Sequence, residues 1–220
     1  MEFQRARSDE QREQRRRVIL STTAAMLAEM PVAQLSLNEL SRRVGLAKSN
    51  VLRYFESREA ILLELLDREL RDWIAELEQS LKQMEGTARE RGNVVAGQLA
   101  RSLAARPVMC DLISAQAAVL ERNISTEVAL RHKRTTAESV QVLVDVITRV
   151  IPELTPAEAY QLIAITLLMT SAAWPQSQPS EALCAAYAAD PAVAATQLDF
   201  TDFMRQTVEL SISGMISRRN

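Results

Sequence analysis

The sequence has few residues that interrupt helices and few that build catalytic or crosslinked sites. Its 220 residues include 5 glycines, 7 prolines, 2 cysteines and 1 histidine, and aromatic residues make up 4%. Scarce glycine and proline favour long helices, because these two residues fit a helix interior worst. Cys110 and Cys184 lack metal-ligand spacing and are too few for a disulfide scaffold. We therefore expect a reducing, cytoplasmic location.

The sequence also lacks the patterns of a membrane protein or an enzyme. Its most apolar stretch, residues 162–174, is 13 residues long, whereas a bilayer span needs roughly 20. Residues 1–17 are polar and rich in arginine, unlike a secretory signal. There is no glycine-rich phosphate loop, metal-binding motif or nucleophile motif. We expect no membrane segment, no catalytic residue, no metal and no cofactor.

Charge is distributed unevenly, although the formal net charge is only −2. Residues 1–58 carry 11 Lys and Arg against 7 Asp and Glu, and residues 59–220 carry 15 against 21. A small basic head on an acidic body is typical of a protein in which only the head approaches phosphates. The asymmetry is consistent with nucleic-acid binding and does not by itself establish it.

Apolar residues recur at helical spacing along most of the chain, which predicts an all-α fold. The segments predicted as helices are residues 9–29, 36–45, 47–55, 58–84, 94–105, 108–120, 125–151, 155–174 and 199–217. Residues 175–195 contain three prolines, and we expect a loop with one short helical piece over residues 176–195.

Several of these helices carry specific end signals. Ser36-x-x-Glu39 and Thr155-x-x-Glu158 have the form of a capping box, in which two side chains satisfy backbone donors at a helix start. Gly45 suits the left-handed conformation that often ends a helix. The signals at Ser36 and Gly45 define two short helices, one on each side of Gly45.

Those two short helices follow a longer one, as in a helix-turn-helix, which places its second short helix in the major groove of DNA. The polar side chains of that helix suit contacts with bases or phosphates: Lys48, Ser49, Asn50 and Arg53. The alternative is a solvated face on a core helix. Spacing and charge alone do not separate the two.

Residues 37–62, LNELSRRVGLAKSNVLRYFESREAIL, resemble the DNA-binding segment of the tetracycline-repressor (TetR) family, and the resemblance covers residues 15–66. Shared features are an apolar first helix, a Ser or Thr starting the second, glycine at the turn, a polar recognition helix ending in Phe, and a basic residue opening the fourth. The resemblance implies a DNA-binding domain at residues 1–56, ordered from about residue 10. It also implies a helical bundle at 57–220 for ligand sensing and dimerisation.

The resemblance also implies which residues contact DNA. Ser36 would touch a phosphate, the start of the recognition helix would face the groove, and Arg58 would bind phosphate. The predicted DNA-binding residues are Ser36, Lys48, Ser49, Asn50, Arg53, Tyr54 and Arg58. Leu52 stands where the family often has a phosphate-binding tyrosine, and Tyr54 where histidine is frequent. Ala47 replaces a capping serine. These departures change contacts and affinity rather than the fold.

The last two long helices are candidates for a dimer interface, because a pseudo-palindromic site needs two heads and small side chains let helices approach closely. The resemblance to the TetR family, which pairs its last two long helices, implies that they form it. The predicted interface residues are Ala164, Ser171, Phe200, Met204, Val208, Ser211 and Met215. The alternative for the apolar members is the core of the subunit.

A ligand pocket is expected between the fourth helix and the middle helices, where helical bundles usually hold ligands. The candidate residues are Trp73, Leu99, Met109, Leu112, Ile113, Gln116, Leu143, Met169 and Trp174. Each also fits an ordinary core position. Few of them are polar, so the expected effector is a moderately hydrophobic small molecule. The basic run at residues 131–134 is interpreted as a solvated helix face, with an anionic ligand as the alternative.

The sequence therefore predicts a DNA-binding transcriptional regulator. We expect it to bind a pseudo-palindromic double-stranded DNA operator as a homodimer and to be a repressor released by a small-molecule effector. The competing hypothesis is a helical dimeric adaptor without sequence-specific DNA binding. Substitutions at Lys48, Asn50 and Arg58 distinguish the two.

Overall fold

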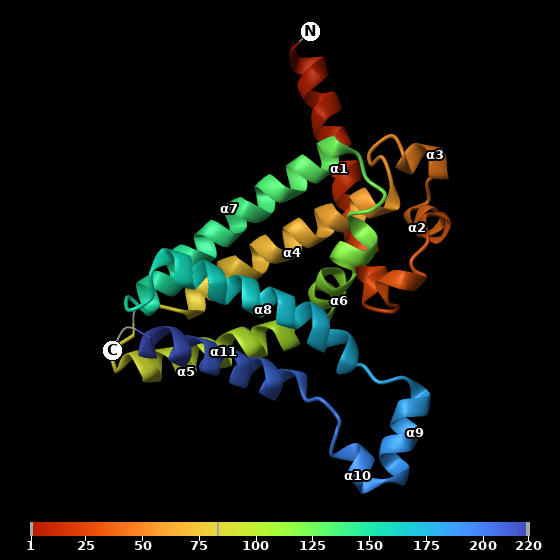
Figure 1. Ribbon diagram of the computed structural model, residues 1–220. Helices are drawn as coiled ribbons and strands as arrows, with labels where there is room; N and C mark the ends of the chain where they lie inside the picture. The colour runs from red at the N-terminus through yellow and green to blue at the C-terminus, as the bar shows by residue number, and fades with distance from the viewer. Residues whose placement is uncertain (1, 83, 219–220) are drawn as a thin grey trace. The chain divides into compact units, whose positions relative to one another are not determined.

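The computed structural model describes residues 2–82 and 84–218, and it contains helices and turns but no strand in that part of the chain (Figure 1). The predicted all-α class is confirmed. The chain forms two compact units. The first comprises the residues up to Glu69 together with Ala115–Arg134, and the second comprises Leu70–Ser114 together with the residues from Thr135 on. The division predicted at residue 56 remains a prediction about function, because these units are defined by packing.

The first unit is built on α1 (Glu2–Leu27), α2 (Leu37–Val44), α3 (Lys48–Val51) and the first part of α4 (Arg58–Ser80). A short 3-10 turn, η1 (Val32–Gln34), follows Pro31. Helices α1 and α2 pack against each other. The fully buried side chains that hold this unit together include Ile19, Met26, Leu35, Leu40, Val51, Ile61 and Leu62.

The ends of α2 follow their sequence signals with one difference. The Oγ of Ser36 accepts a hydrogen bond from the backbone N–H of Glu39 at 3.2 Å. Gly45 ends the helix in the left-handed conformation with φ 71°, which glycine adopts without steric cost. The Glu39 carboxylate, however, pairs with Arg42 and Arg43 instead of closing the capping box. Two nearby cations outcompete the reciprocal bond to Ser36.

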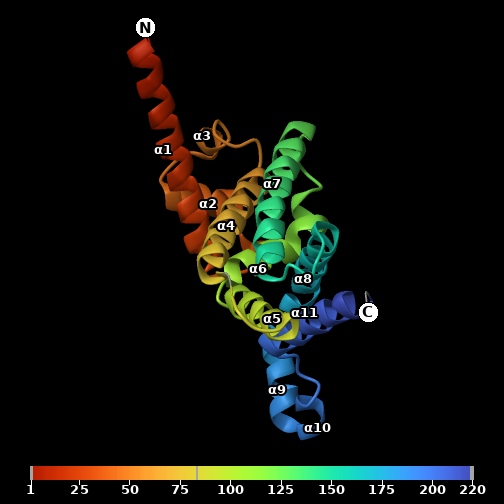
Figure 2. The ribbon, with the colours of Figure 1, turned by 90° about the vertical axis from the view of Figure 1, so that its left-hand side faces the viewer.

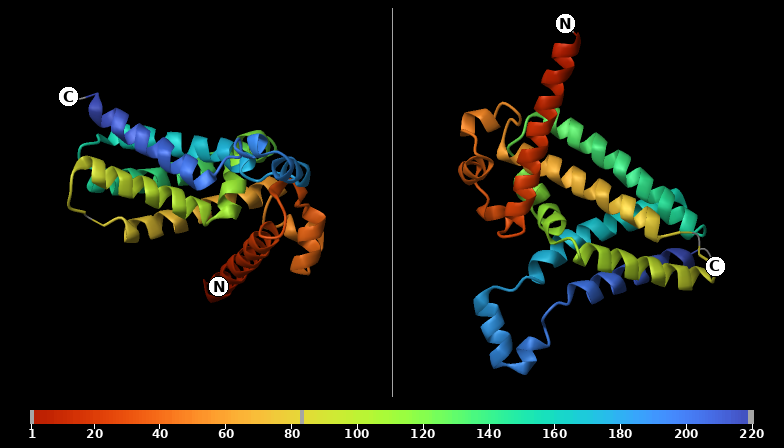
Figure 3. Two further views of the ribbon diagram at one scale, coloured as in Figure 1. Left: turned by 90° about the horizontal axis from the view of Figure 1, so that it is seen from below. Right: turned by 180° about the vertical axis from the view of Figure 1, so that it is seen from behind.

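The second unit contains α5 (Ala88–Ala104), most of α6 (Pro107–Ala115), α8 (Pro156–Gln176) and α11 (Phe200–Ser217), with the later part of α7 (Thr126–Val150). Helix α11 packs against α5 and α8. Between α8 and α11 the chain forms α9 (Glu181–Ala189) and α10 (Pro191–Ala194), which project away from that layer (Figures 1 and 3).

Some boundaries differ from the prediction because local caps act where periodicity is weak. Helix α5 begins six residues earlier than predicted, since Thr87 and Glu90 form a complete capping box. The predicted box at Thr155 and Glu158 is confirmed at the start of α8. Residues 176–195 contain two short helices rather than one, capped by the side chains of Ser180 and Asp190.

The predicted helix over residues 108–120 changes character along its length. It is α-helical as α6 and then continues as a π-helical turn, η2 (Gln116–Leu120).

Buried Cys110 lies in α6, and burial raises the pKa of its thiol to about 12. Both cysteines are free. No single helix in the described part of the chain has the length and apolarity that crossing a membrane requires.

Candidate nucleic-acid interface

The recognition segment is short and is fixed from its inner side. Helix α3 spans only Lys48–Val51, and residues 52–54 continue as turns, so it is shorter than predicted. Val51 and Phe55 are buried. Lys48, Ser49 and Asn50 are exposed. The two apolar anchors therefore leave the predicted DNA-contacting side chains of α3 on the outer surface, together with exposed Arg53.

Arg16 on α1 holds this segment in place. Its guanidinium donates hydrogen bonds to the backbone carbonyl of Tyr54 and to the carboxylate of Glu64, and lies 4.2 Å from the centroid of the Phe55 ring. One side chain thus ties α1, the end of the recognition segment and α4 together. This role of Arg16 was not predicted, because nothing in the run at residues 15–17 shows which arginine turns inward.

Arg58 and Ser36 lie close to the recognition segment in the sequence and both have partners within the protein. The Nη1 of Arg58 donates to the carbonyl of Leu35 at 2.8 Å, and its Nη2 pairs with Glu59 at 3.1 Å. This arrangement fixes the start of α4 to the residue before the Ser36 cap. Ser36 is exposed, and its O–H remains available as a donor because the cap uses the oxygen as an acceptor. Both phosphate contacts remain predictions.

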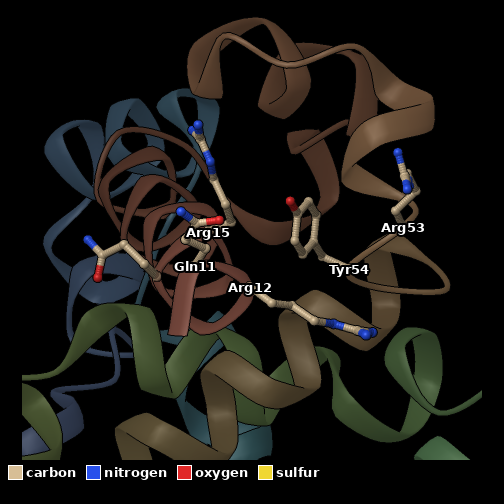
Figure 4. A pocket seen from close by; sticks show the side chains of 6 residues that line it. Gln11, Arg12, Arg15, Arg53 and Tyr54 are labelled. Atoms are coloured by element: carbon tan, nitrogen blue, oxygen red, sulfur yellow. The ribbon is translucent and has the colours of Figure 1, made fainter. Parts of the chain in front are cut away.

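A cavity of about 670 Å³ lies between the first half of α1 and Tyr54. Figure 4 shows the Tyr54 ring between the side chains of Arg15 and Arg53, with Arg12 below it in that view. The residues that line the cavity are Gln11, Arg12, Gln14, Arg15, Arg53 and Tyr54. Sequence analysis placed Arg53 and Tyr54 at the DNA surface and did not select the α1 residues.

The segment of residues 115–134 belongs to the same unit and is attached by polar contacts. The Glu56 carboxylate accepts hydrogen bonds of 2.7 Å from the backbone N–H and the Oγ of Ser125, and these bonds lower the pKa of Glu56. His132 is only 2% exposed, and its Nδ1 lies 2.6 Å from the Oδ1 of Asp67. Its Nε2 lies 3.1 Å from the Nε2 of Gln116.

The interpretation of residues 131–134 as a solvated face is therefore wrong for His132, whose neighbours in the run are exposed. A buried carboxylate on α4 gives the imidazole a partner that the local sequence does not reveal. Gln116, predicted as a ligand residue, also donates to the Oε1 of Glu121 at 2.7 Å in this network.

The other predicted ligand residues lie in the second unit. Six of them are buried: Trp73, Leu99, Met109, Leu112, Ile113 and Leu143. The indole N–H of Trp73 donates to the Oγ of Ser102 at 2.9 Å. Met169 and Trp174 are half-buried, and the Trp174 ring meets Phe200 edge to face with centroids 5.1 Å apart. Their role in ligand binding remains a prediction.

The predicted dimer residues fall into two groups. Phe200, Met204 and Val208 are buried within the subunit, where α11 packs on α5 and α8. The half-buried group is Ala164, Ser171, Ser211 and Met215. Large apolar side chains that sequence analysis did not select are exposed on the same two helices: Tyr160 (61%), Leu168 (65%), Phe203 (37%) and Leu210 (73%).

Two family models together match most of the chain. Residues 19–65 match the model of bacterial regulatory proteins of the tetR family, and residues 67–219 match that of the tetracyclin repressor-like C-terminal domain. The chain belongs to the TetR family. The resemblance seen in the sequence is thereby confirmed, and the protein is a TetR-family transcriptional regulator with a helix-turn-helix head.

Relatives of this TetR-family chain are similar over part of the sequence or in the fold. The HTH-type transcriptional regulator EthR of Mycobacterium tuberculosis (strain ATCC 25618 / H37Rv) is 40% identical over 50 residues, which make up 23% of this chain and 23% of EthR. The match thus spans about a quarter of the length of that relative. At this span EthR shows a likeness over part of the chain only.

Solved structures extend the likeness over nearly the whole chain. A TetR transcriptional regulator from Rhodococcus sp. RHA1 has a TM-score of 0.58 at 12% identity, covering 94% of this chain and 99% of that one. FadR from Bacillus subtilis, in complex with stearoyl-CoA, has a TM-score of 0.56 at 18% identity, covering 90% and 97%. At these identities the likeness shows a shared fold alone.

Proposed function

We propose that this TetR-family protein is a cytoplasmic repressor that binds a pseudo-palindromic operator as a homodimer. The observation that carries the proposal is that the recognition segment is anchored from its inner side and polar on its outer side. Val51 and Phe55 are buried, and Arg16 fixes the backbone. Lys48 and Asn50 are exposed together. A helix held from behind with polar side chains outside is what major-groove reading requires. Under the adaptor hypothesis the same side chains are a solvated face on a core helix, and their substitution would have no effect on DNA binding.

The proposed contacts divide by chemistry. The Asn50 amide suits paired hydrogen bonds to an adenine edge, and Lys48 suits a guanine edge or a phosphate. Arg53 suits a phosphate, and the Ser36 hydroxyl can donate to another. We propose that Arg58 acts first as a positioning residue, because its guanidinium already binds Leu35 and Glu59.

The proposed dimer uses the exposed apolar faces of α8 and α11. On α8, Tyr160, Ala164 and Leu168 follow one another at four-residue spacing and share a face. On α11, Leu210 and Gly214 are related in the same way, and a Cβ at Gly214 would meet nothing within 4 Å. Exposed side chains as large as Leu168 and Leu210 favour burial in a second copy of the chain.

The proposed effector is a moderately hydrophobic small molecule that binds in the second unit. The residues that support this class are apolar or aromatic and lie on several helices of that unit, including Trp73, Met109 and Leu143. The stearoyl-CoA in the FadR structure from Bacillus subtilis is a ligand of that protein. It makes long-chain acyl compounds a reasonable first group to screen here.

The operator contact is tested by fluorescence anisotropy with duplexes from the DNA beside the protein's own gene and an unrelated duplex as reference. Lys48→Ala and Asn50→Ala are each expected to weaken specific binding by about 5- to 150-fold per half-site, the equivalent of about 1–3 kcal/mol per base contact. Lys82→Ala removes the same charge at an exposed site of the second unit and should leave affinity unchanged. Wild-type operator affinity in both folded recognition variants would favour the adaptor.

A further inference from the structure

Four arginines near the middle of α1 have different surroundings. Arg16 is engaged with Tyr54, Phe55 and Glu64 as described above. The Nε of Arg17 lies 3.5 Å from a carboxylate oxygen of Glu13. Arg12 and Arg15 are exposed and form no ion pair with any side chain that the structure describes. Neither cation is therefore neutralised by a described side chain, and both are exposed.

Arg12 and Arg15 face a space that a predicted DNA-contacting residue also borders. Both line the cavity of about 670 Å³, together with Arg53 and Tyr54 (Figure 4). Figure 2 shows the first half of α1 running past α3 within the first unit. Because Arg53 borders the cavity and also follows the recognition helix, an occupant of the cavity would lie next to bases contacted by α3.

The lining of the cavity selects for an anion. It contains three guanidinium groups, two primary amides and a phenol, and none of the six lining residues is acidic. Like charges gathered without a counter-charge repel one another, and an anion between them removes that repulsion. Guanidinium groups bind phosphate through paired hydrogen bonds, and Gln and Tyr side chains commonly donate to phosphate oxygens.

We propose that this cavity receives the sugar-phosphate backbone of the operator, with Arg12 and Arg15 as phosphate ligands that α1 contributes beside the recognition helix. The site rests on the proposed DNA binding and extends it to residues outside the helix-turn-helix. The cavity is open and far wider than a single phosphate, which favours a polymer backbone over a small ion. Contacts of this kind position the protein on the duplex without reading its sequence.

The salt dependence of binding tests the proposal, because each phosphate contact contributes a slope of about −0.9 to log K against log salt. Arg12→Gln and Arg15→Gln each remove one contact per subunit and two per dimer. Each is therefore expected to reduce the slope by about 1.8, so that the ratio of wild-type to variant affinity falls about 12-fold between about 50 and about 200 mM salt. The loss should be equal on operator and unrelated DNA. Arg17→Gln, the matched control on the same helix, should keep the wild-type slope.

Wild-type slopes in both Arg12→Gln and Arg15→Gln, with unchanged thermal unfolding, would overturn the proposal. Loss of inorganic pyrophosphate binding in those variants without a change in DNA slope would also overturn it and would assign the cavity to a free anion. Failure of the proposed function is distinguishable from both results. In that case no duplex is preferred, while the slope difference between Arg15→Gln and Arg17→Gln persists on unrelated DNA.

Discussion

At the scale of single residues, a few buried or half-buried polar side chains hold the first unit together. Arg16 joins three segments through its guanidinium. The His132 imidazole joins Asp67 on α4 to Gln116 in the π-helical turn η2. A buried polar group that loses its partner carries its full desolvation cost. The stability of the first unit therefore depends on pairs such as Asp67 and His132, which lie 65 residues apart in the sequence.

We expect His132→Ala to lower the free energy of unfolding by about 1–3 kcal/mol, because it removes one hydrogen bond to the buried Asp67 carboxylate. His132→Asn is the matched variant, since its amide keeps a donor directed at Asp67. Its free energy of unfolding should fall clearly less than that of His132→Ala. Urea unfolding followed by circular dichroism measures both. Equal urea midpoints for His132→Ala and the wild type would show that the pair of His132 and Asp67 contributes nothing to stability.

At the scale of elements, helices α5 and α11 approach closely at a glycine. A Cβ at Gly92 would lie 2.9 Å from the Cγ2 of Ile212, a branched side chain that is itself buried. Ile212 cannot move aside easily because its methyl group is attached directly to Cβ. Gly214 on α11 has open space instead. The two glycines thus have different structural roles on neighbouring helices.

Gly92→Ala is expected to destabilise the subunit by about 1–3 kcal/mol, as overpacked cores do. Gly214→Ala, which gains helix propensity without a clash, is expected to be neutral or to stabilise an isolated subunit by up to about 1 kcal/mol. Thermal unfolding of the two variants at one low protein concentration compares them. A higher melting temperature for Gly92→Ala than for the wild type would contradict the close approach.

At the scale of the whole molecule, assembly depends on which face of each long helix the subunit leaves uncovered. One stripe of α11, containing Met204 and Val208, is buried in the subunit. Leu210 on the same helix and Leu168 on α8 are more than half exposed. A pair of heads on a two-fold site requires a contact between subunits, and the exposed stripes are the surfaces available for it.

Leu168→Arg and Leu210→Arg are each expected to convert the dimer to single chains and to weaken operator binding, because two linked heads bind a palindrome far more tightly than one. Sedimentation velocity measures the first effect and anisotropy the second. Leu183→Arg on α9 places the same charge at a residue that is 48% exposed, and should leave the dimer intact. Dimers that persist in both α8 and α11 variants would exclude this interface.

The positions of most helices and their caps could be predicted because their causes are local. Ser36, Gly45 and Thr155 act on backbone groups within a few residues. The start of α5 was missed although Thr87-x-x-Glu90 has the same form, so that signal was present in the sequence. The head was also predictable, since its motif is contiguous over residues 37–62 and its family is confirmed.

The tertiary structure alone decided which members of each similar set turn inward. Arg16, and not Arg15 or Arg17, reaches Tyr54 and Glu64. The Met204 stripe of α11, and not the Leu210 stripe, packs into the subunit. The cavity beside Tyr54 brings α1 residues to a site at which only Arg53 and Tyr54 were predicted from the sequence. Local sequence determines where a helix begins and ends, whereas the face that it buries depends on neighbours that are distant along the chain.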